Sequence, residues 1–321
     1  MFTTGFDRAG LSARLVALAQ RGVYLGTSSW KYPGWLGQIY DEERYLHHGR
    51  FSLTRFGRRC LAEYAETFST VCVDAAYYRF PDERHLESLV SQVPPGFRFG
   101  FKVTDEITVR RFSNLPRFGD RAGQVNPGFL NAERFVTEFL EPCAAFRDSI
   151  GVLIFEFSRF YPSDFARGRD FVAALDGFLG ALPGGWPYAV EIRNHSFLHP
   201  DYFAVLARHG VSHTFNNWDV MPDIAEQLDL PGSMTAPHLA TARFLLRSGR
   251  RYQEAVERFA PYARIQDANP AGRAAGARII RDTLAATGGR RAFLYVNNRF
   301  EGNAPQTIAA MLEQVTEPQG P

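Results

Sequence analysis

Two opposite charges, Glu191 and Arg193, interrupt an apolar run within residues 188–197 (YAVEIRNHSF). Side chains two residues apart on a β-strand point to the same face, so we expect these two to lie side by side. Polar residues follow at once, which indicates that the strand ends there. Such charges could be a buried ion pair that only fixes the strand, but charge at a strand's carboxyl end is typical of a barrel site. We therefore expect a functional site, with Glu191 as a general acid or base.

Other expected strands also end in polar residues, and in a closed parallel sheet all these ends meet at one rim. Lys102 and Arg193 are suited to clamp an anionic group, because lysine supplies a point charge and arginine a two-pronged donor. The predicted catalytic residues are Glu191, Arg193, Lys102, Glu156 and Asp74. The predicted substrate-binding residues are Thr27, Ser28, Trp30, Trp35, Tyr78, Asn216, Asn297 and Asn298.

Several chemistries are open to these residues. Glu156 and Glu191 could form a carboxylate pair for acid–base work, because neighbouring carboxylates split their pKa values. Glycosidases of the common barrel type need a second carboxylate on strand seven, and residues 241–246 contain none. Oxygen ligands from Asp74, Glu156 and Glu191 could hold a divalent metal, but we predict neither metal nor cofactor. Cys72 is expected to be a small buried residue and not a nucleophile.

Composition narrows the class of protein. The chain has 321 residues, a net charge of +2, and 45% hydrophobic residues, which is ordinary for a globular protein. The near-balanced charge argues against nucleic acid as a partner, and no apolar run approaches the ~18 residues of a membrane span. Three widely spaced cysteines exclude a disulfide framework and a cysteine-rich zinc site. We expect a cytoplasmic protein with a small-molecule ligand; the oligomeric state stays open.

The periodicity of the chain predicts eight strands alternating with helices. The expected strands cover residues 23–27, 71–76, 97–103, 150–157, 188–193, 211–215, 241–246 and 292–296. The expected helices cover residues 11–20, 55–68, 82–92, 129–146, 164–179, 200–208, 272–286 and 305–315. This alternation predicts an α/β fold, a single (β/α)8 TIM-type barrel over residues 23–321, preceded by a helical extension at residues 1–22. An irregular, arginine-rich third βα loop, residues 104–126, is expected to lie over the barrel mouth and to move.

The order of several motifs carries a resemblance: GTSSW-Y-GW, YYR-P, P-F-F-K, VEIRN-SF and NN-EGNAP. From about residue 26 to the C-terminal helix, the chain resembles the domain of unknown function 72 family, the YecE-like proteins. The resemblance implies a TIM-type barrel and no particular activity. The chain departs from the family pattern at Cys72 and Asp74 on strand two, at Glu156 on strand four, and at Val109 after Lys102. We expect these departures to redistribute charge at the rim.

Together these features predict an enzyme that acts on a small polar, anionic substrate at the mouth of the barrel. Chemistry of the hydrolase, lyase or isomerase type is favoured over redox chemistry. Glu191 would be the acid or base, and Arg193 and Lys102 would hold the anion. The alternative is a non-catalytic barrel that binds a ligand or nucleic acid through loop 104–126 and the aromatic residues of the rim.

Overall fold

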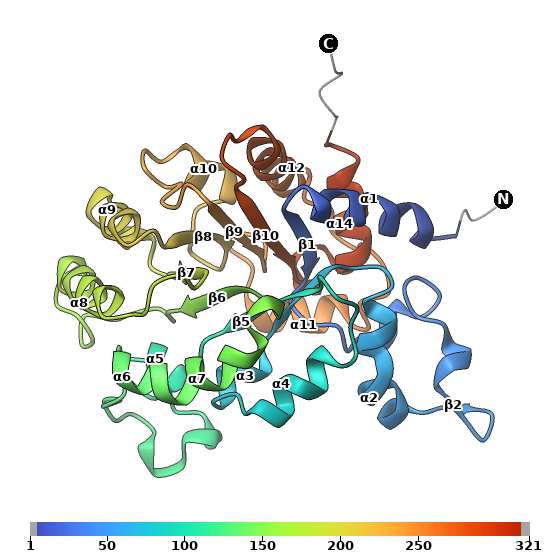
Figure 1. Cartoon of the computed structure of the whole chain (residues 1–321), viewed down its shortest axis with the longest axis horizontal. Coiled ribbons are helices and arrows are strands. Elements are labelled where there is room, and N and C mark those ends of the chain that lie inside the picture. Colours follow the sequence, from blue (N-terminus) through green and yellow to red (C-terminus); the bar gives the residue numbers. More distant parts are fainter. Residues whose placement is uncertain (1–4, 316–321) are drawn as a thin grey trace.

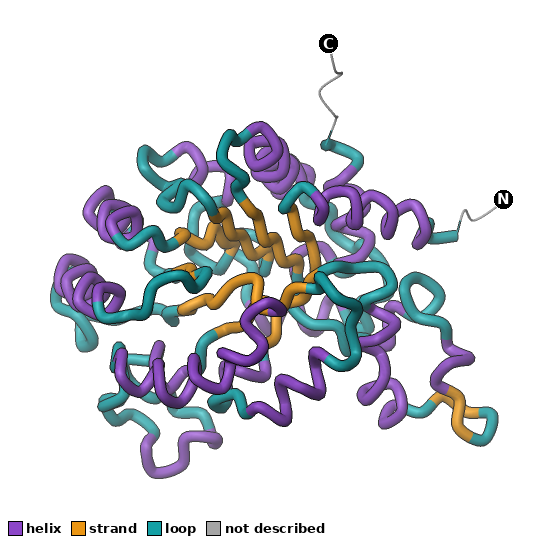
Figure 2. Tube along the Cα trace, in the orientation of Figure 1, coloured by secondary structure: helices purple, strands orange, loops and turns teal. Residues whose placement is uncertain are grey.

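The computed structural model describes residues 5–315 and contains a closed barrel of eight parallel strands surrounded by helices (Figures 1 and 2). Around the barrel the strands follow the order β1, β4, β5, β6, β7, β8, β9 and β10, and β10 pairs with β1 to close it. The barrel strands are β1 (Val23–Thr27), β4 (Thr70–Val73), β5 (Arg98–Lys102), β6 (Ile150–Glu156), β7 (Tyr188–Glu191), β8 (Ser212–Asn217), β9 (Leu239–Phe244) and β10 (Arg291–Val296). The predicted α/β barrel is confirmed.

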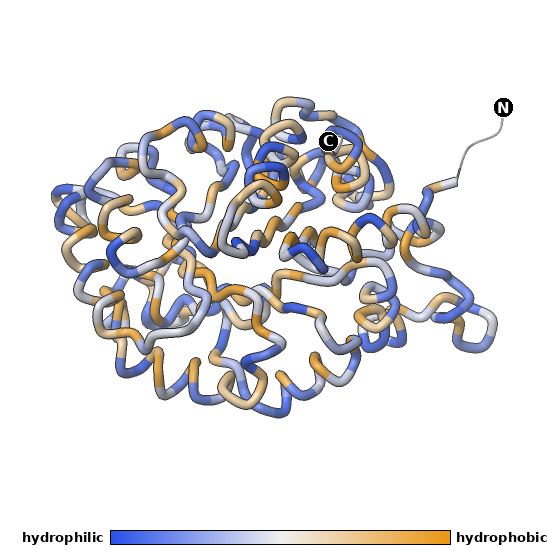
Figure 3. The backbone as a smooth tube through the Cα atoms, turned by 45° about the horizontal axis from the view of Figure 1, so that its top comes forward, coloured by the Kyte–Doolittle hydropathy of each residue, from blue (hydrophilic) through white to orange (hydrophobic). Residues whose placement is uncertain are grey.

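Helices cover the outside of the barrel, and Figure 3 shows hydrophilic and hydrophobic residues alternating along them. The longer ones are α1 (Arg8–Gln20), α2 (Leu53–Tyr64), α4 (Glu83–Val90), α8 (Gly168–Gly180), α9 (Pro200–Arg208), α10 (Ile224–Asp229), α11 (Tyr252–Phe259), α12 (Pro270–Ala285) and α14 (Ala304–Leu312). The short ones are α3 (Ala75–Tyr78), α5 (Asp105–Thr108), α6 (Ala132–Phe135), α7 (Glu141–Cys143) and α13 (Asn298–Glu301). Their apolar faces pack on the strands, which are buried on both sides as in other parallel sheets.

Large side chains fill the lower part of the barrel interior. All seven residues of β6 are buried, and Tyr295 of β10 is fully enclosed. Gly100 of β5 makes room for that ring, because a Cβ at this position would lie 2.3 Å from the Tyr295 hydroxyl oxygen. Sites of barrels with such a packed interior lie at the carboxyl ends of the strands.

Some element boundaries differ from the prediction. The expected strand 71–76 ends at Val73, and Asp74 instead precedes the one-turn helix α3. The expected strand 241–246 is two residues early, at Leu239–Phe244. The expected helix 129–146 is broken into α6, a π-helical turn (Val136–Leu140), α7 and a 3-10 turn (Ala144–Ser149). Pro142 explains the break, because it has no backbone N–H for the regular helical hydrogen bond.

Two features lie outside the barrel. Helix α1 packs against its outer side, burying Leu11 and Leu15, while Arg8 pairs with Glu63 and Glu66 near the end of α2. A small antiparallel hairpin, β2 (Leu46–His47) with β3 (Arg50–Phe51), was not predicted. It belongs to the long connection between β1 and α2, and Figure 1 shows it projecting from the barrel beside α2.

Candidate functional site

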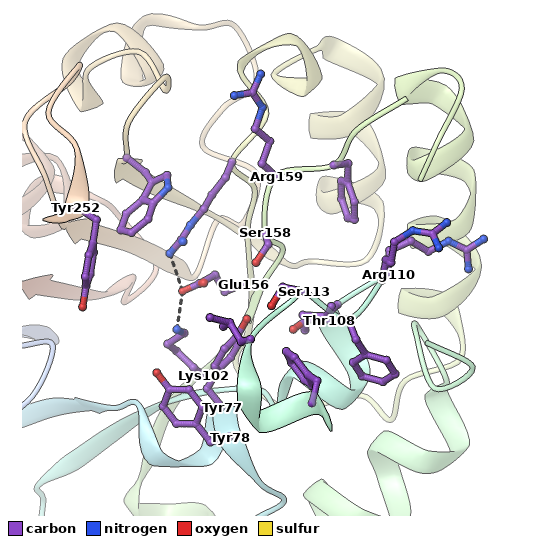
Figure 4. A pocket seen from close by; sticks show the side chains of 18 of the residues that line it. Tyr77, Tyr78, Lys102, Thr108, Arg110, Ser113, Glu156, Ser158, Arg159 and Tyr252 are labelled. Atoms are coloured by element: carbon purple, nitrogen blue, oxygen red, sulfur yellow. Dashed lines mark ion pairs between the residues drawn. The ribbon is translucent and has the colours of Figure 1, made fainter. Parts of the chain in front are cut away.

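A pocket of about 710 Å³, the mouth pocket, lies at the carboxyl ends of the barrel strands (Figure 4). Its floor contains Lys102 at the end of β5, Glu156 at the end of β6, Arg193 just after β7, and Arg243 of β9. One side is formed by the loop after β5, and the other by residues after β8 and β10. Four different strands therefore bring charged side chains to one place, as expected for a barrel site.

Glu156 is at the centre of this charge. One of its carboxylate oxygens, Oε2, lies 2.8 Å from Lys102 Nζ, 2.9 Å from Arg193 Nη2 and 2.7 Å from Arg243 Nη1. Figure 4 shows Lys102, the last residue of β5, pointing at this carboxylate. Glu156 lines the mouth pocket, and within the described residues its other oxygen, Oε1, accepts no hydrogen bond. One oxygen thus anchors three cations while the other is left for a ligand.

Glu191 lies beside Glu156, because the register of β6 and β7 pairs these two residues. Its side chain is fully buried and does not line the mouth pocket. Both oxygens are used: Oε1 accepts from Arg193 Nε and Nη2 at 3.3 Å, and Oε2 accepts from Arg243 Nη1 at 2.6 Å. Glu191 and Arg193 therefore share a face, and Glu191 holds the two arginines from below.

These five residues, Lys102, Glu156, Glu191, Arg193 and Arg243, are called the ion cluster below. Burial by itself raises the pKa of Glu156, but the charges of Arg193, Lys102 and Arg243 outweigh it and hold the pKa well below its ordinary value. Burial lowers the pKa of Lys102, yet Glu156 and Asp74 raise it above its ordinary value. At neutral pH the cluster therefore contains a carboxylate and an ammonium group, and neither readily gives up its charge.

Asp74 is the least constrained of the predicted catalytic residues. It lines the mouth pocket, and its Oδ1 lies 3.8 Å from Lys102 Nζ and 3.9 Å from an Arg243 Nη2. These separations are ion-pair distances and too long for hydrogen bonds. About a third of the Asp74 side chain, 37%, is exposed. Its carboxylate is therefore free to contact a ligand or to move.

Aromatic rings surround the cations. Lys102 Nζ lies 3.9 Å from the centre of the Tyr77 ring, and the Arg193 guanidinium lies 3.8 Å from that of Trp218. These contacts position the cations through cation–π attraction. Tyr78, predicted as a binding residue, also lines the pocket and is 62% exposed, so its ring is available to a ligand.

Several predicted binding residues do not line the mouth pocket. Trp35 is fully buried and donates from Nε1 to Asn298 Oδ1 at 3.2 Å, while Thr27 Oγ1 lies 2.9 Å from the Tyr64 hydroxyl. Asn216 is buried and donates to the Ile192 carbonyl at 3.1 Å. Trp30 and Ser28 are buried outside the pocket as well. Of the rim asparagines predicted to bind substrate, Asn297 alone lines it.

The loop of residues 104–126 forms one wall of the pocket, so it lies at the barrel mouth as predicted. Its arginines are largely used within the protein. Arg117 pairs with buried Asp105 at 2.5 Å, Arg121 with Glu106 at 2.7 Å, and Arg111 with Asp164 at 3.6 Å. Arg110 lines the pocket and lies over the rings of Phe129 and Phe165.

Arg243 is the residue that the sequence prediction left out of the site. It is 3% exposed and bridges Glu156 and Glu191 with one nitrogen, Nη1. A signal was present, since Thr241 and Arg243 alternate with apolar residues in β9 and so share the inner face. The predicted strand ran on to residue 246, so Arg243 was not counted among the polar residues at its carboxyl end. Trp218, Tyr252 and Arg299 also line the pocket without having been predicted as site residues.

Cys72 is buried, and burial raises the pKa of its thiol to about 12, so it is not a thiolate at neutral pH.

Within residues 5–315, no three His, Cys, Asp or Glu side chains are grouped so as to hold a metal ion. No helix in that part of the chain combines the length and the apolar character that crossing a membrane demands.

Fold and site together define a TIM-type (β/α)8 barrel protein with a buried ion cluster at its carboxyl-end mouth. Residues 24–321 match the family described as Protein of unknown function DUF72, and the chain belongs to this family. It is 26% identical over 182 residues to the UPF0759 protein YecE of Escherichia coli, in strain K12 and in O157:H7. That match covers 57% of this chain and spans about half, 50%, of the curated relatives' length.

Solved structures support the same fold. A DUF72 family protein from Enterococcus faecalis V583 matches with a TM-score of 0.60 and 19% identity, covering 93% of this chain and 97% of the other. A DUF72 family protein from Thermotoga maritima MSB8 matches with a TM-score of 0.58 and 18% identity, covering 92% and 99% of the two chains. At this level of identity the likeness concerns the barrel itself.

Proposed function

We propose that this chain binds a small anionic molecule in the mouth pocket and acts on it as an enzyme, by proton transfer rather than by redox chemistry. The observation that carries the proposal is the ion cluster: three cations, of which Lys102 and Arg243 are buried, converge on Glu156 at the floor of a pocket of about 710 Å³. Burying so much charge is costly, and sites that tolerate this cost are more often functional than structural.

Charge favours an anionic ligand. Eight arginine or lysine side chains line the pocket against three carboxylates. Arg243 Nε is buried and has no hydrogen-bond partner among the described residues, and no ion pair to Arg299 is found there either. A carboxylate or phosphate group of a ligand would supply the missing acceptors through charge-assisted hydrogen bonds.

The chain has two lysines, Lys31 and Lys102, against 34 arginines. One of these two lysines is among the three cations that contact Glu156. With its pKa raised, Lys102 stays protonated, which suits electrostatic stabilisation of a developing negative charge and not attack as a neutral amine.

Asp74 is the pocket carboxylate best suited to accept a proton from the ligand, because its side chain makes no hydrogen bond among the described residues. Glu156 also lines the pocket with its Oε1 unengaged, but its lowered pKa keeps it ionised, so it holds the cations in place and accepts hydrogen bonds from the ligand. Glu191, the residue favoured from the sequence, has both oxygens occupied beneath the floor. In this proposal it positions Arg193 and Arg243, so its contribution to acid–base chemistry is indirect.

A thermal-shift screen tests the binding step. Carboxylates, phosphates and sulfates are compared with neutral compounds of the same skeleton, because a true ligand stabilises the folded state by mass action. An anion should raise the Tm of the wild type and of Lys31→Gln, and should lose this effect with Lys102→Gln. Lys102→Gln leaves Glu156 two guanidinium partners, so the barrel should still fold. Equal responses to neutral compounds, or an unchanged response in Lys102→Gln, would contradict the proposal.

The enzymatic step is tested with a stabilising anion from that screen. Incubation with wild-type protein, followed by NMR of the small molecule, should reveal a new product. Asp74→Asn should still bind the anion while turnover falls by about 10²-fold or more, the usual contribution of a general base. Circular dichroism before the assay establishes that the variant is folded. If the anion is recovered unchanged after prolonged incubation with the wild type, the proposal that the protein is an enzyme is wrong and only the proposed binding stands.

A further inference from the structure

A second positively charged surface, unrelated to the mouth pocket, lies on the β2–β3 hairpin and the first turns of α2. Between residues 44 and 59 the chain has five arginines and two histidines, with no aspartate or glutamate. The whole chain has a net charge of only +2, so the excess of positive charge in this segment is local. Acidic residues elsewhere in the chain offset it in the net charge. Figure 1 shows that the hairpin stands out from the barrel, where a large partner could reach it.

The structure gathers part of this segment into an open groove of about 550 Å³, called the basic groove. Its lining residues are His47, Ser52, Thr54, Arg55, Arg58 and Arg59. None of them belongs to the mouth pocket. The side chains offer hydrogen-bond donors from guanidinium, imidazole and hydroxyl groups, and the lining includes no carboxylate.

The groove's arginines are not neutralised by the protein. Arg44, at the edge of the segment, pairs with Glu63 and Glu66, but within residues 5–315 no ion pair is found for Arg58 or Arg59. Both are exposed on α2. Arg55 is held in place by donating from Nη1 to the Leu46 carbonyl at 2.9 Å, while its buried Nε has no partner among the described residues. The groove therefore presents one anchored arginine, Arg55, beside two exposed arginines without an ion pair among the described residues.

We infer that the basic groove binds the phosphate backbone of a nucleic acid. Arginine matches phosphate with two parallel hydrogen bonds, and serine and threonine hydroxyls are common phosphate donors. A protein partner would require an apolar or aromatic centre, which the lining lacks. Anchoring to a membrane surface requires several inserted apolar side chains, whereas Leu53 is the exposed large aliphatic residue of this segment. No aromatic residue lines the groove to stack on bases, so binding is independent of sequence.

The test measures fluorescence anisotropy of a labelled DNA strand and duplex, each of about 20 nucleotides per strand, at salt concentrations from about 50 to 200 mM. The groove variant is Arg58→Gln with Arg59→Gln, which leaves the anchored Arg55 untouched. The matched control is Arg21→Gln with Arg169→Gln, two exposed arginines outside the groove that remove the same charge. Circular dichroism and a thermal melt establish that both double variants fold as the wild type does.

Wild type and control should bind at the lower salt concentration, with affinity falling as salt rises. The groove variant should bind at least tenfold more weakly, and its slope of log K against log salt should be smaller by about 1–2, one unit or less per lost phosphate contact. Equal weakening in groove variant and control would assign binding to net charge and overturn the inference. So would failure of the wild type to bind either probe, or binding only to vesicles of phosphatidylserine.

Discussion

The role of Glu191 depends on its contact with Arg243 as much as on its contact with Arg193. The pair with Arg193 follows from strand geometry, but the bond from Arg243 engages the remaining oxygen and closes the carboxylate off from the pocket. A buried carboxylate with both oxygens engaged contributes mainly by compensating its cations.

Replacing Glu191 by glutamine should therefore lower the free energy of unfolding by about 3–5 kcal/mol, because Arg193 and Arg243 lose their compensating charge. Urea denaturation measures this. Glu254→Gln is the control. This carboxylate is 55% exposed and makes a long ion pair, 3.8 Å, with Arg250, so its loss should cost less than about 1 kcal/mol. A Glu191→Gln protein as stable as the wild type, with ligand binding lost, would return Glu191 to a direct role in the chemistry.

His213, inside β8, gives the protein a pH dependence unrelated to the site. Burial lowers the pKa of His213 from 6.5 to about 4. The unfolded chain binds this proton below about pH 6.5 and the folded protein only below about pH 4, so stability should fall across that window, by about 3 kcal/mol in total. Denaturation of wild type and His213→Asn at several pH values measures this. The variant's curve should be flatter between about pH 6.5 and 4, and parallel curves would exclude His213 as the cause.

At the scale of elements, the third βα loop is held by one buried side chain. Asn126 donates from Nδ2 to the carbonyls of Glu106 at 2.9 Å and Val109 at 2.8 Å, and its Oδ1 accepts from Gly128 at 2.9 Å. These bonds join the two ends of the loop and fix its base; the motion predicted for the loop stays a prediction.

Asn126→Ala should release the loop base, because it leaves buried backbone groups without partners. We expect a loss of about 2–4 kcal/mol in unfolding free energy and faster hydrogen exchange across residues 104–126. Asn114→Ala, at an exposed position of the same loop, is the control and should change neither. If both variants exchange like the wild type, the loop is fixed by its ion pairs, such as Arg117 with Asp105, and not by Asn126.

At the scale of the whole molecule, α1 is joined to the barrel at both of its flanks. Ser12 donates to the Glu66 carbonyl after α2, and Arg14 donates to the Leu312 carbonyl at the end of α14. Helix α1 thus links the elements that follow the first strand with those that follow the last, across the position where the barrel closes. An extension placed there is expected to stabilise closure.

Deleting residues 1–22 should lower the free energy of unfolding by about 3–6 kcal/mol, the amount expected for two buried leucines alone. Chemical denaturation of the shortened chain measures this. Leu15→Ala is the companion variant and should account for about 2–5 kcal/mol of the loss. A shortened chain that unfolds at the same denaturant concentration as the full one would mean that the extension is dispensable for the barrel.

The amino-acid pattern alone predicted the barrel and the charged rim. Alternating apolar runs specify strands, helical spacing specifies covering helices, and parallel strands necessarily bring their carboxyl ends together. For that reason Lys102, Glu156 and Arg193 could be assigned to one site although they are far apart in the chain. The order of the motifs indicated the family, and the match over residues 24–321 confirms it.

Only the tertiary structure decided which rim residues face the pocket. Trp35 and Asn298 are separated by 263 positions and bond to each other within the packed interior, which no local pattern could reveal. Arg243 enters the site because β9 ends at Phe244, two residues before the end of the predicted strand, and this places Arg243 at the rim. Side-chain direction in loops is set by contacts between distant segments, whereas strand and helix periodicity is set by neighbours in the chain.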